Sequence, residues 1–197
     1  MQAELKKLRS DLEKLIDEVY VGEKKVLVHG EGEPGARVML IGEAPGQQET
    51  LARRPFVGKA GKNLDEFLEM AGIDRSDLYV SNTVKFRPTR VSAAGRIINR
   101  PPTREEINLF LPWLKREIEL VAPQIVVTLG NVPLRALLSS RATIGEMHGQ
   151  RIRAGELEIY PMYHPASIIY NPSLREVYAE DVQKLGRWLS GNAPAEG

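Results

Sequence analysis

The sequence has no cysteine among its 197 residues. This absence excludes disulfide bonds, thiolate nucleophiles and any metal or cluster held by cysteine. Histidine is also scarce, and His29, His148 and His164 lie too far apart to show the ligand spacing of a zinc site. We therefore expect no bound metal and no cofactor.

The sequence also lacks an excess of positive over negative charge and any long apolar run. The 27 Lys and Arg residues nearly balance 26 Asp and Glu residues, so any surface for a polyanion must be local. No apolar run approaches the ~18 residues of a membrane span, and the N-terminal segment MQAELKKLRSDLEKLIDEVY does not resemble a signal peptide. We expect a cytoplasmic monomer with one domain over residues 1–190, and a flexible tail over residues 191–197.

Four apolar runs read as buried strands, and helical patterns separate them. The expected strands are 37–42, 78–85, 124–130 and 158–164, and the expected helices are 3–20, 61–71, 103–121, 132–138 and 173–189. Thr103 and Glu106 form a capping box at the start of the third of these helices. The alternation predicts an α/β fold with a parallel sheet and helices on both of its faces.

Polar residues gather at the predicted carboxyl ends of the strands, where such sheets bind their ligands. The first strand runs into the turn GEAPG with Glu43, the second contains Asn82, and the fourth ends at His164. We expect these three side chains to surround one edge of the sheet.

The turn IGEAPGQQET, residues 41–50, has the glycines of a phosphate cradle. It carries Glu43 and Glu49, however, and it lacks both G-x-G-x-x-G and a Lys-Ser/Thr ending. A phosphate-binding α/β enzyme is therefore a poor hypothesis. The turn is either a tight connection without chemistry or a site built on carboxylates, and the nearby PFVG at 55–58 favours the second.

Three residues near this turn each have a structural and a functional interpretation. Phe56, in a loop with several basic residues, is either a core side chain or a ring that stacks on a base. Asn82 is either a satisfied buried amide or a group that reads a base edge with one donor and one acceptor. His164 is either structural or a neutral donor to a developing oxyanion.

A run of basic residues follows the second strand. Six basic residues and no acidic residue occur between positions 85 and 104: Lys85, Arg87, Arg90, Arg96, Arg100 and Arg104. In a chain with a net charge of +1, this run is either a solvated loop or a patch for phosphates.

Five segments in a fixed order carry a resemblance to a known family. They are GEAPG at 42–46, RPFVGKAG at 54–61, SNTVKFRP at 81–88, NRPPTREE at 99–106 and HPAS at 164–167. Together they resemble the uracil-DNA glycosylase superfamily, and most closely its family 4. The resemblance extends from about residue 5 to residue 189.

The resemblance implies a three-layer α/β/α fold around a central four-stranded parallel sheet. It also implies hydrolysis of the N-glycosidic bond of deoxyuridine in single- or double-stranded DNA, after the base has been flipped out of the stack. With the basic residues nearby, it assigns catalytic roles to Glu43, Ala44, Glu49 and His164, uracil binding to Gly42, Phe56, Asn82 and His164, and DNA binding to Arg54, Lys59, Lys62, Lys85, Arg87, Ser167 and Ile168. In this assignment Ile168 is the wedge that fills the gap in the base stack.

The chain departs from family 4 at the cysteines that hold a 4Fe-4S cluster in typical members. Phe86 and Phe110 stand at the third and fourth ligand positions, and apolar residues near 16–19 replace the first pair. We expect apolar packing in place of the cluster. Two alternatives stay open: a glycosylase that prefers hypoxanthine or xanthine, and a lesion-binding protein with little or no catalysis.

Overall fold

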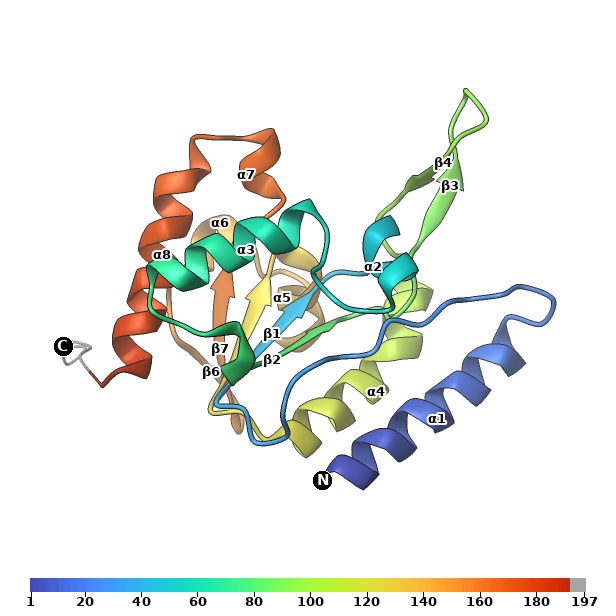
Figure 1. Ribbon diagram of the computed structural model, residues 1–197, viewed down its shortest axis with the longest axis horizontal. Coiled ribbons are helices and arrows are strands. Elements are labelled where there is room, and N and C mark those ends of the chain that lie inside the picture. The colour runs from blue at the N-terminus through green and yellow to red at the C-terminus, as the bar shows by residue number, and fades with distance from the viewer. Residues whose placement is uncertain (192–197) are drawn as a thin grey trace.

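The computed structural model describes residues 1–191, and a five-stranded sheet forms its centre (Figure 1). The strand order is β2-β1-β5-β7-β6. Four parallel strands match the predicted ones: β1 (Val38–Gly42), β2 (Leu78–Asn82), β5 (Ile125–Leu129) and β7 (Leu157–Met162). The fifth strand, β6 (Ile152–Ala154), pairs antiparallel with β7. It was not predicted, because three half-exposed residues carry too little of an apolar pattern.

The five predicted helices are present, and three short ones join them. The long helices are α1 (Gln2–Val19), α3 (Lys59–Met70), α4 (Arg104–Val121) and α8 (Leu174–Leu189), and the shorter ones are α2 (Gln47–Ala52), α5 (Asn131–Leu137), α6 (Ile144–Met147) and α7 (Ser167–Tyr170). A 3-10 turn, η1 (Arg75–Asp77), precedes β2. The capping box of α4 is confirmed: Thr103 Oγ1 accepts a hydrogen bond from Glu106 N at 3.2 Å, and Glu106 Oε2 accepts one from Thr103 N at 2.7 Å.

Helices cover both faces of the sheet, as the α/β pattern predicts. Val38 and Leu40 of β1 pack in the core that α3 and α8 cover, whereas Met39 and Ile41 pack against α1 and α4. This alternation follows from the two-residue period of a strand. Both faces of β1 are therefore buried, which explains its continuous apolar sequence.

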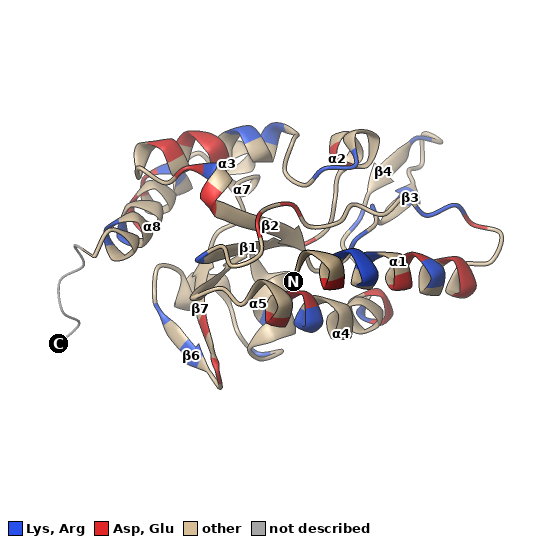
Figure 2. Ribbon diagram, turned by 60° about the horizontal axis from the view of Figure 1, so that its bottom comes forward, with Lys and Arg blue, Asp and Glu red and all other residues tan. Residues whose placement is uncertain are grey.

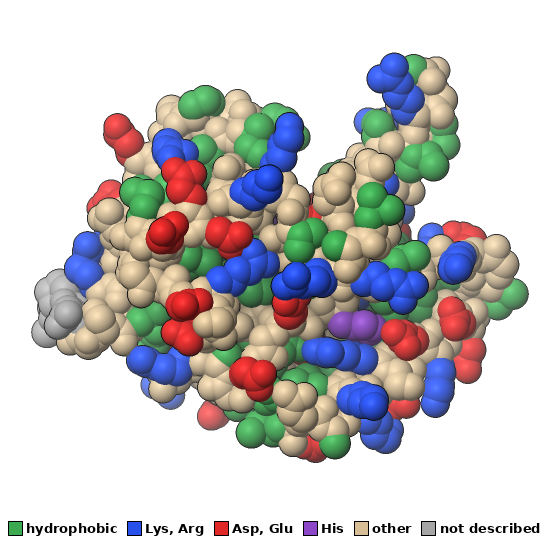
Figure 3. All heavy atoms as spheres, viewed as in Figure 1, with side chains coloured by type: hydrophobic (Ala, Val, Ile, Leu, Met, Phe, Trp, Pro, Cys, Tyr) green, Lys and Arg blue, Asp and Glu red, His purple; other side chains and the backbone are tan. Residues whose placement is uncertain are grey.

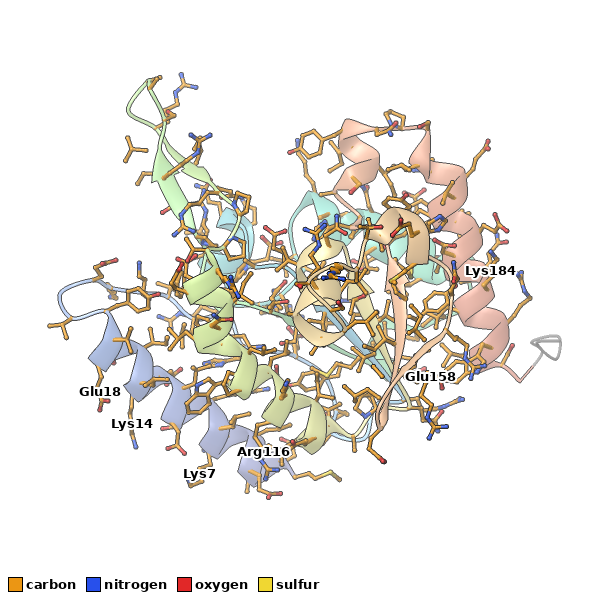
Figure 4. All side chains as sticks on the ribbon, turned by 180° about the vertical axis from the view of Figure 1, so that it is seen from behind. Lys7, Lys14, Glu18, Arg116, Glu158 and Lys184 are labelled. Atoms are coloured by element: carbon orange, nitrogen blue, oxygen red, sulfur yellow. The ribbon has the colours of Figure 1, made fainter. Side chains whose placement is uncertain are left out.

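Helix α1 lies along α4 with its apolar stripe inward. Leu5, Leu12 and Ile16 are buried, whereas the charged side chains at its back, labelled in Figure 4, point away from the body. None of the described helices is both long and apolar enough to cross a membrane. The predicted tail lies, from residue 192 on, outside the described residues.

A second, two-stranded sheet projects from the body as a narrow arm (Figure 1). It consists of β3 (Thr89–Val91) and β4 (Ile97–Asn99), which pair antiparallel. Most of its residues are exposed, so it has no core face that an alternating pattern could have indicated. We call residues 89–99 the hairpin arm.

Candidate active site

A pocket of about 630 Å³ lies beyond the carboxyl ends of β1, β2 and β7, at the edge where the sequence predicts a site. Its lining brings together six of the seven catalytic and base-binding residues expected from the sequence, all except Gly42: Glu43, Ala44, Glu49, Phe56, Asn82 and His164. The volume suits a small planar ligand. Figure 3 shows the notch between the hairpin arm and the body of the molecule on this side.

Gly42, the last residue of β1, lies directly behind two side chains that line the pocket. A Cβ atom here would lie 2.5 Å from Asn82 Oδ1 and 2.6 Å from Phe56 Cζ. The carbonyl oxygen of Gly42 accepts hydrogen bonds from Thr83 N at 2.8 Å and from Thr83 Oγ1 at 2.9 Å. Glycine is required here because any larger residue would displace the amide and the ring that line the pocket.

Glu43 follows at the start of the turn, and its carboxylate faces the pocket without a fixed partner. Within residues 1–191 its side chain makes no hydrogen bond, and burial raises the pKa of its carboxyl group. Half-buried and unpaired, the carboxylate is available to a water molecule or to a positive charge on a ligand.

Glu49 has a different role, because backbone donors occupy both of its carboxylate oxygens. Oε2 accepts from Gly46 N at 3.1 Å, and Oε1 accepts from Gly58 N at 2.7 Å. These two glycines precede α2 and α3, so Glu49 ties together the starts of the two helices. It shapes the pocket wall, and the direct catalytic role that the sequence suggested for it stays a prediction.

Phe56 forms a buried wall of the pocket in an unusual backbone conformation. Its φ is 52°, in the left-handed region that a bulky residue rarely adopts. Arg75 holds this loop by donating hydrogen bonds to the carbonyl oxygens of Phe56 at 3.0 Å and of Pro55 at 2.9 Å. Such strain costs about 1–3 kcal/mol and persists where the surroundings enforce it. The ring lies 6.0 Å from that of His164, centroid to centroid, with 30° between their planes.

Asn82 ends β2 with its amide in the pocket. The residue is 3% exposed, yet its side-chain amide has no hydrogen-bond partner among residues 1–191. Its backbone carbonyl oxygen accepts a hydrogen bond from Lys85 Nζ at 2.7 Å. The amide is open to the pocket, so a ligand with a matching donor and acceptor can pair with both of its polar atoms.

His164 has a defined tautomer. Its Nδ1 accepts a hydrogen bond from Ala166 N at 3.1 Å, so in the neutral ring the proton is on Nε2. Burial lowers its pKa to about 4, against a smaller opposing effect of Glu49. His164 is therefore neutral near pH 7, with a single N–H donor for the pocket.

Comparison with known proteins identifies the family of this chain. The family model described as the uracil DNA glycosylase superfamily matches residues 29–186. The chain belongs to the uracil-DNA glycosylase superfamily.

Two relatives, at 36% and 38% identity, are type-4 enzymes by name. The "Type-4 uracil-DNA glycosylase" of Sulfurisphaera tokodaii is 36% identical over 190 residues, which are 88% of this chain and 83% of the relative. That of Saccharolobus solfataricus is 38% identical over 176 residues, 85% of this chain and 78% of the relative. The crystal structure of wild-type Pedobacter heparinus SMUG2 has a TM-score of 0.55 and 13% identity, and the match covers 92% of this chain and 83% of that one. This last likeness concerns the fold.

The cluster ligands of family 4 have no counterpart in this glycosylase fold. Phe86 and Phe110 stand at two expected ligand positions, with their ring centroids 5.5 Å apart in an edge-to-face contact. Ile16 packs in the same apolar cluster, and Ala44 of the pocket turn packs against it. The side chains present cannot ligate iron, so they do not fit a 4Fe-4S cluster. Apolar packing fills this region, as the sequence led us to expect.

Lys85 is a correction to the predicted DNA-binding residues. It is 2% exposed, and its Nζ donates to Glu117 Oε2 at 2.6 Å, Ser81 Oγ at 2.6 Å and the Asn82 carbonyl oxygen. Glu117 also accepts from Tyr79 Oη at 3.0 Å and Ser81 Oγ at 2.9 Å. Burial alone would raise the pKa of Glu117, but Lys85 and these hydrogen bonds together lower it. Since all three ammonium hydrogens have partners inside the protein, Lys85 cannot contact DNA.

Ile168 is a second correction. It is 6% exposed and packs in the core beside α8, so it cannot enter a base stack. Ile169 and Tyr170 follow it on α7, line the pocket and are 46% and 87% exposed. The sequence pattern could not show that Ile168 points into the core, because the direction in which a residue of a one-turn helix points depends on its tertiary packing.

Among the other predicted DNA-binding residues, Lys59 lines the pocket. Lys59 and Lys62 are exposed at the first turns of α3, which Figure 2 shows as a basic end followed by acidic turns. Arg54 pairs with Glu31 at 2.5 Å, Arg87 donates to Asn99 Oδ1 at 2.7 Å, and Ser167 starts α7. Contact of these residues with DNA stays a prediction.

Sequence reasoning missed several residues of the pocket rim. Pro88, Asn99 and Arg100 line the pocket on the side of the hairpin arm. Arg100 is bound to Glu106 through two hydrogen bonds, at 2.7 and 2.6 Å. Only the basic run between positions 85 and 104 pointed to this region, and it did not separate pocket residues from paired ones.

Proposed function

We propose that this chain is a uracil-DNA glycosylase, which hydrolyses the N-glycosidic bond of deoxyuridine in DNA and leaves an abasic site. The observation that carries the proposal is the pocket itself. It holds an unpartnered amide, a neutral imidazole N–H donor, an aromatic wall and an unpaired carboxylate within one cavity. The names of the type-4 relatives support the same activity.

Uracil matches the polar groups of the pocket. In the proposed complex the Asn82 amide oxygen accepts from uracil N3–H, and its NH2 group donates to O4. Cytosine presents the opposite pattern at both positions, so the same amide discriminates against it. Phe56 provides a flat apolar surface for the ring.

Bond cleavage places negative charge on the base and positive charge on the sugar, and the pocket has one group that can stabilise each. The C1′–N1 bond breaks with its electron pair on uracil, and His164 Nε2–H donates to O2 as negative charge builds there. Glu43 faces the sugar, where its carboxylate stabilises the positive charge and orients the attacking water. The water oxygen bonds to C1′, and its proton leaves through the carboxylate to solvent.

The substrate must leave the base stack to reach these groups. We propose that the protein acts as a cytoplasmic monomer on uracil-containing DNA, without a cofactor. The exposed Tyr170 and Ile169 on the rim take the place that the sequence had suggested for Ile168 and support the emptied stack.

A second candidate substrate is hypoxanthine. Its N1–H and O6 present the same donor and acceptor to Asn82 as uracil does, and a pocket of about 630 Å³ has room for a purine. The activity is then the same hydrolysis with another preferred base.

One assay separates these functions. Labelled oligonucleotides with a single uracil, hypoxanthine, xanthine or cytosine are incubated with the protein and then treated with alkali, which cleaves at abasic sites. We expect cleavage at uracil and none at cytosine. Faster cleavage at hypoxanthine would favour the second candidate, and binding without any cleavage would identify a lesion-binding protein.

A further inference from the structure

The hairpin arm exposes apolar side chains to solvent, although burying them would stabilise the protein. Val91 and Ile97 are 68% and 66% exposed, although they are the apolar cross-strand pair of this small sheet. The arm contains two arginines, Arg90 and Arg96, and no acidic residue. Figure 2 shows basic colour on the arm and no acidic colour.

The two arginines of the arm differ from three of the other four basic residues of their run. Lys85 is buried against Glu117, Arg100 pairs with Glu106, and Arg87 donates to Asn99. The Arg90 and Arg96 side chains make no hydrogen bond or ion pair among residues 1–191, and both residues are exposed. Their charges are therefore available to a partner.

The register of the arm connects its apolar pair to the pocket. Thr89 pairs with Asn99, and Val91 pairs with Ile97. Residues two apart in a strand lie on the same face, so Val91 and Ile97 lie on the face that carries Asn99, and Asn99 lines the pocket. The apolar pair thus continues the pocket rim outward.

The arm and α7 form two sides of the pocket mouth. Asn99 and Arg100 line the pocket from the arm side, and Ile169 and Tyr170 line it from α7. Figure 3 shows the arm standing clear of the body, with basic side chains toward its tip. A strand that delivers a base to the pocket must pass between these sides.

We propose that the hairpin arm binds the DNA strand beside the extruded nucleotide. Val91 and Ile97, on the pocket-side face, lie against the sugars or bases, and the long side chains of Arg90, on the other face, and Arg96 reach past the edge of the arm to phosphates. This inference rests on the proposed function. Arg96 is three residues from Asn99, or about 10 Å along a strand. With about 3.4 Å per nucleotide in one strand of a duplex, the arm reaches about three nucleotides from the uracil.

The test compares Arg90→Ala/Arg96→Ala with a control that removes the same charge elsewhere. Lys6→Ala/Lys115→Ala serves, since both lysines are exposed and unpaired within residues 1–191 and lie on α1 and α4. Binding is measured at several salt concentrations with an oligonucleotide that contains 2′-fluoro-deoxyuridine, which resists cleavage. We expect the arm variant to bind more weakly and to lower the slope of log K against log salt by about 0.7–0.9 for each lost phosphate contact. The control should keep the wild-type slope.

A second variant and a length series sharpen the result. Val91→Ser/Ile97→Ser should weaken binding with an unchanged salt slope, because no charge is removed. The loss in the arginine variant should appear only with oligonucleotides that extend at least about three nucleotides to one side of the uracil. Single-turnover excision at saturating enzyme should stay at the wild-type rate for both variants.

The outcomes separate this inference from the proposed function. Wild-type affinity and salt slope in the arginine variant, or an equal loss in the lysine control, would overturn the role of the arm while excision continues. If the wild-type protein releases no base from any of the oligonucleotides, the proposed function fails instead.

Discussion

Two regions meet at the end of β2: a buried hydrogen-bonded network around Lys85 and Glu117, and the pocket. Polar groups are paired within the protein in the first and left available to a ligand in the second. Ser81 belongs to a network in which Lys85, Glu117 and Tyr79 satisfy one another through hydrogen bonds of 2.6–3.0 Å. Asn82, the next residue, presents to the pocket an amide that has no hydrogen-bond partner among residues 1–191. Neighbouring side chains on a strand point to opposite faces, so one position serves the fold and the next can serve a ligand. Substitutions in the network should therefore affect stability, and substitutions in the pocket should affect the reaction.

The largest effect should follow from Lys85→Met. Among residues 1–191, Lys85 is the one cation that contacts Glu117, so its loss leaves a buried carboxylate uncompensated. Breaking a buried pair in this way costs about 3–5 kcal/mol of unfolding free energy. Urea unfolding followed by circular dichroism measures the loss. Lys85→Met combined with Glu117→Leu should recover much of it, because no charge then remains buried. Equal stability of wild type and Lys85→Met would show that the network contributes little.

In the pocket, His164→Ala should slow the reaction with little effect on folding. Its N–H donor acts as charge builds on the leaving base, so its loss should raise the barrier by about 2.7–4 kcal/mol, or about a hundredfold to a thousandfold in rate. Single-turnover excision measures the rate, and DNA binding should be nearly unchanged.

Glu43→Gln should act in the same step, through the charge on the sugar. We expect it also to slow single-turnover excision and to leave both DNA affinity and unfolding free energy close to wild type. If DNA binding were lost in parallel with the rate in either variant, these residues would belong to the scaffold, and the contrast with the network would fail.

A smaller effect is expected from Asn82→Asp. The change removes the donor for uracil O4 and leaves a polar group of the bound base unpaired, at a cost of about 1–3 kcal/mol, or about tenfold to a hundredfold in excision rate. Asn108→Asp on the exposed face of α4 is the matched control, and it should be neutral. Excision by Asn82→Asp at the wild-type rate would show that the amide is structural.

The contrast between the two regions also explains what the sequence could predict. Asn82 and His164 were found because the carboxyl ends of parallel strands converge at one edge, whatever the remaining packing. Lys85 and Arg90 looked alike in the same basic run, because the partner that buries Lys85 is Glu117, 32 residues further along the chain. Such a long-range pairing leaves no local pattern. The tautomer of His164 likewise depends on the Ala166 N–H group, which only the folded loop directs at Nδ1.

The pH dependence of excision should show the smallest effect and test the charge states directly. Burial raises the pKa of Glu43 above its usual value of 4.5 and lowers that of His164 to about 4. As the pH falls from 7, the Glu43 carboxylate is therefore protonated before His164, and its protonation should produce an acid limb in the rate. Glu43→Gln should lack this limb. The same limb in Glu43→Gln would assign the titration to another group.

The pH dependence of folding stability tests the lowered pKa of His164 independently of the reaction rate. His164 binds its proton at about pH 4 in the folded state and near pH 6.5 in the unfolded chain. Between these values the unfolded state binds more protons, so His164 makes the folded state less stable as the pH falls from 6.5 toward 4. His164→Ala removes this contribution, and its melting temperature should decline less over that range than that of the wild type. A parallel decline in both proteins would mean that His164 titrates at its ordinary pKa, so that it would be largely protonated at pH 5 and unable to act there as the neutral donor.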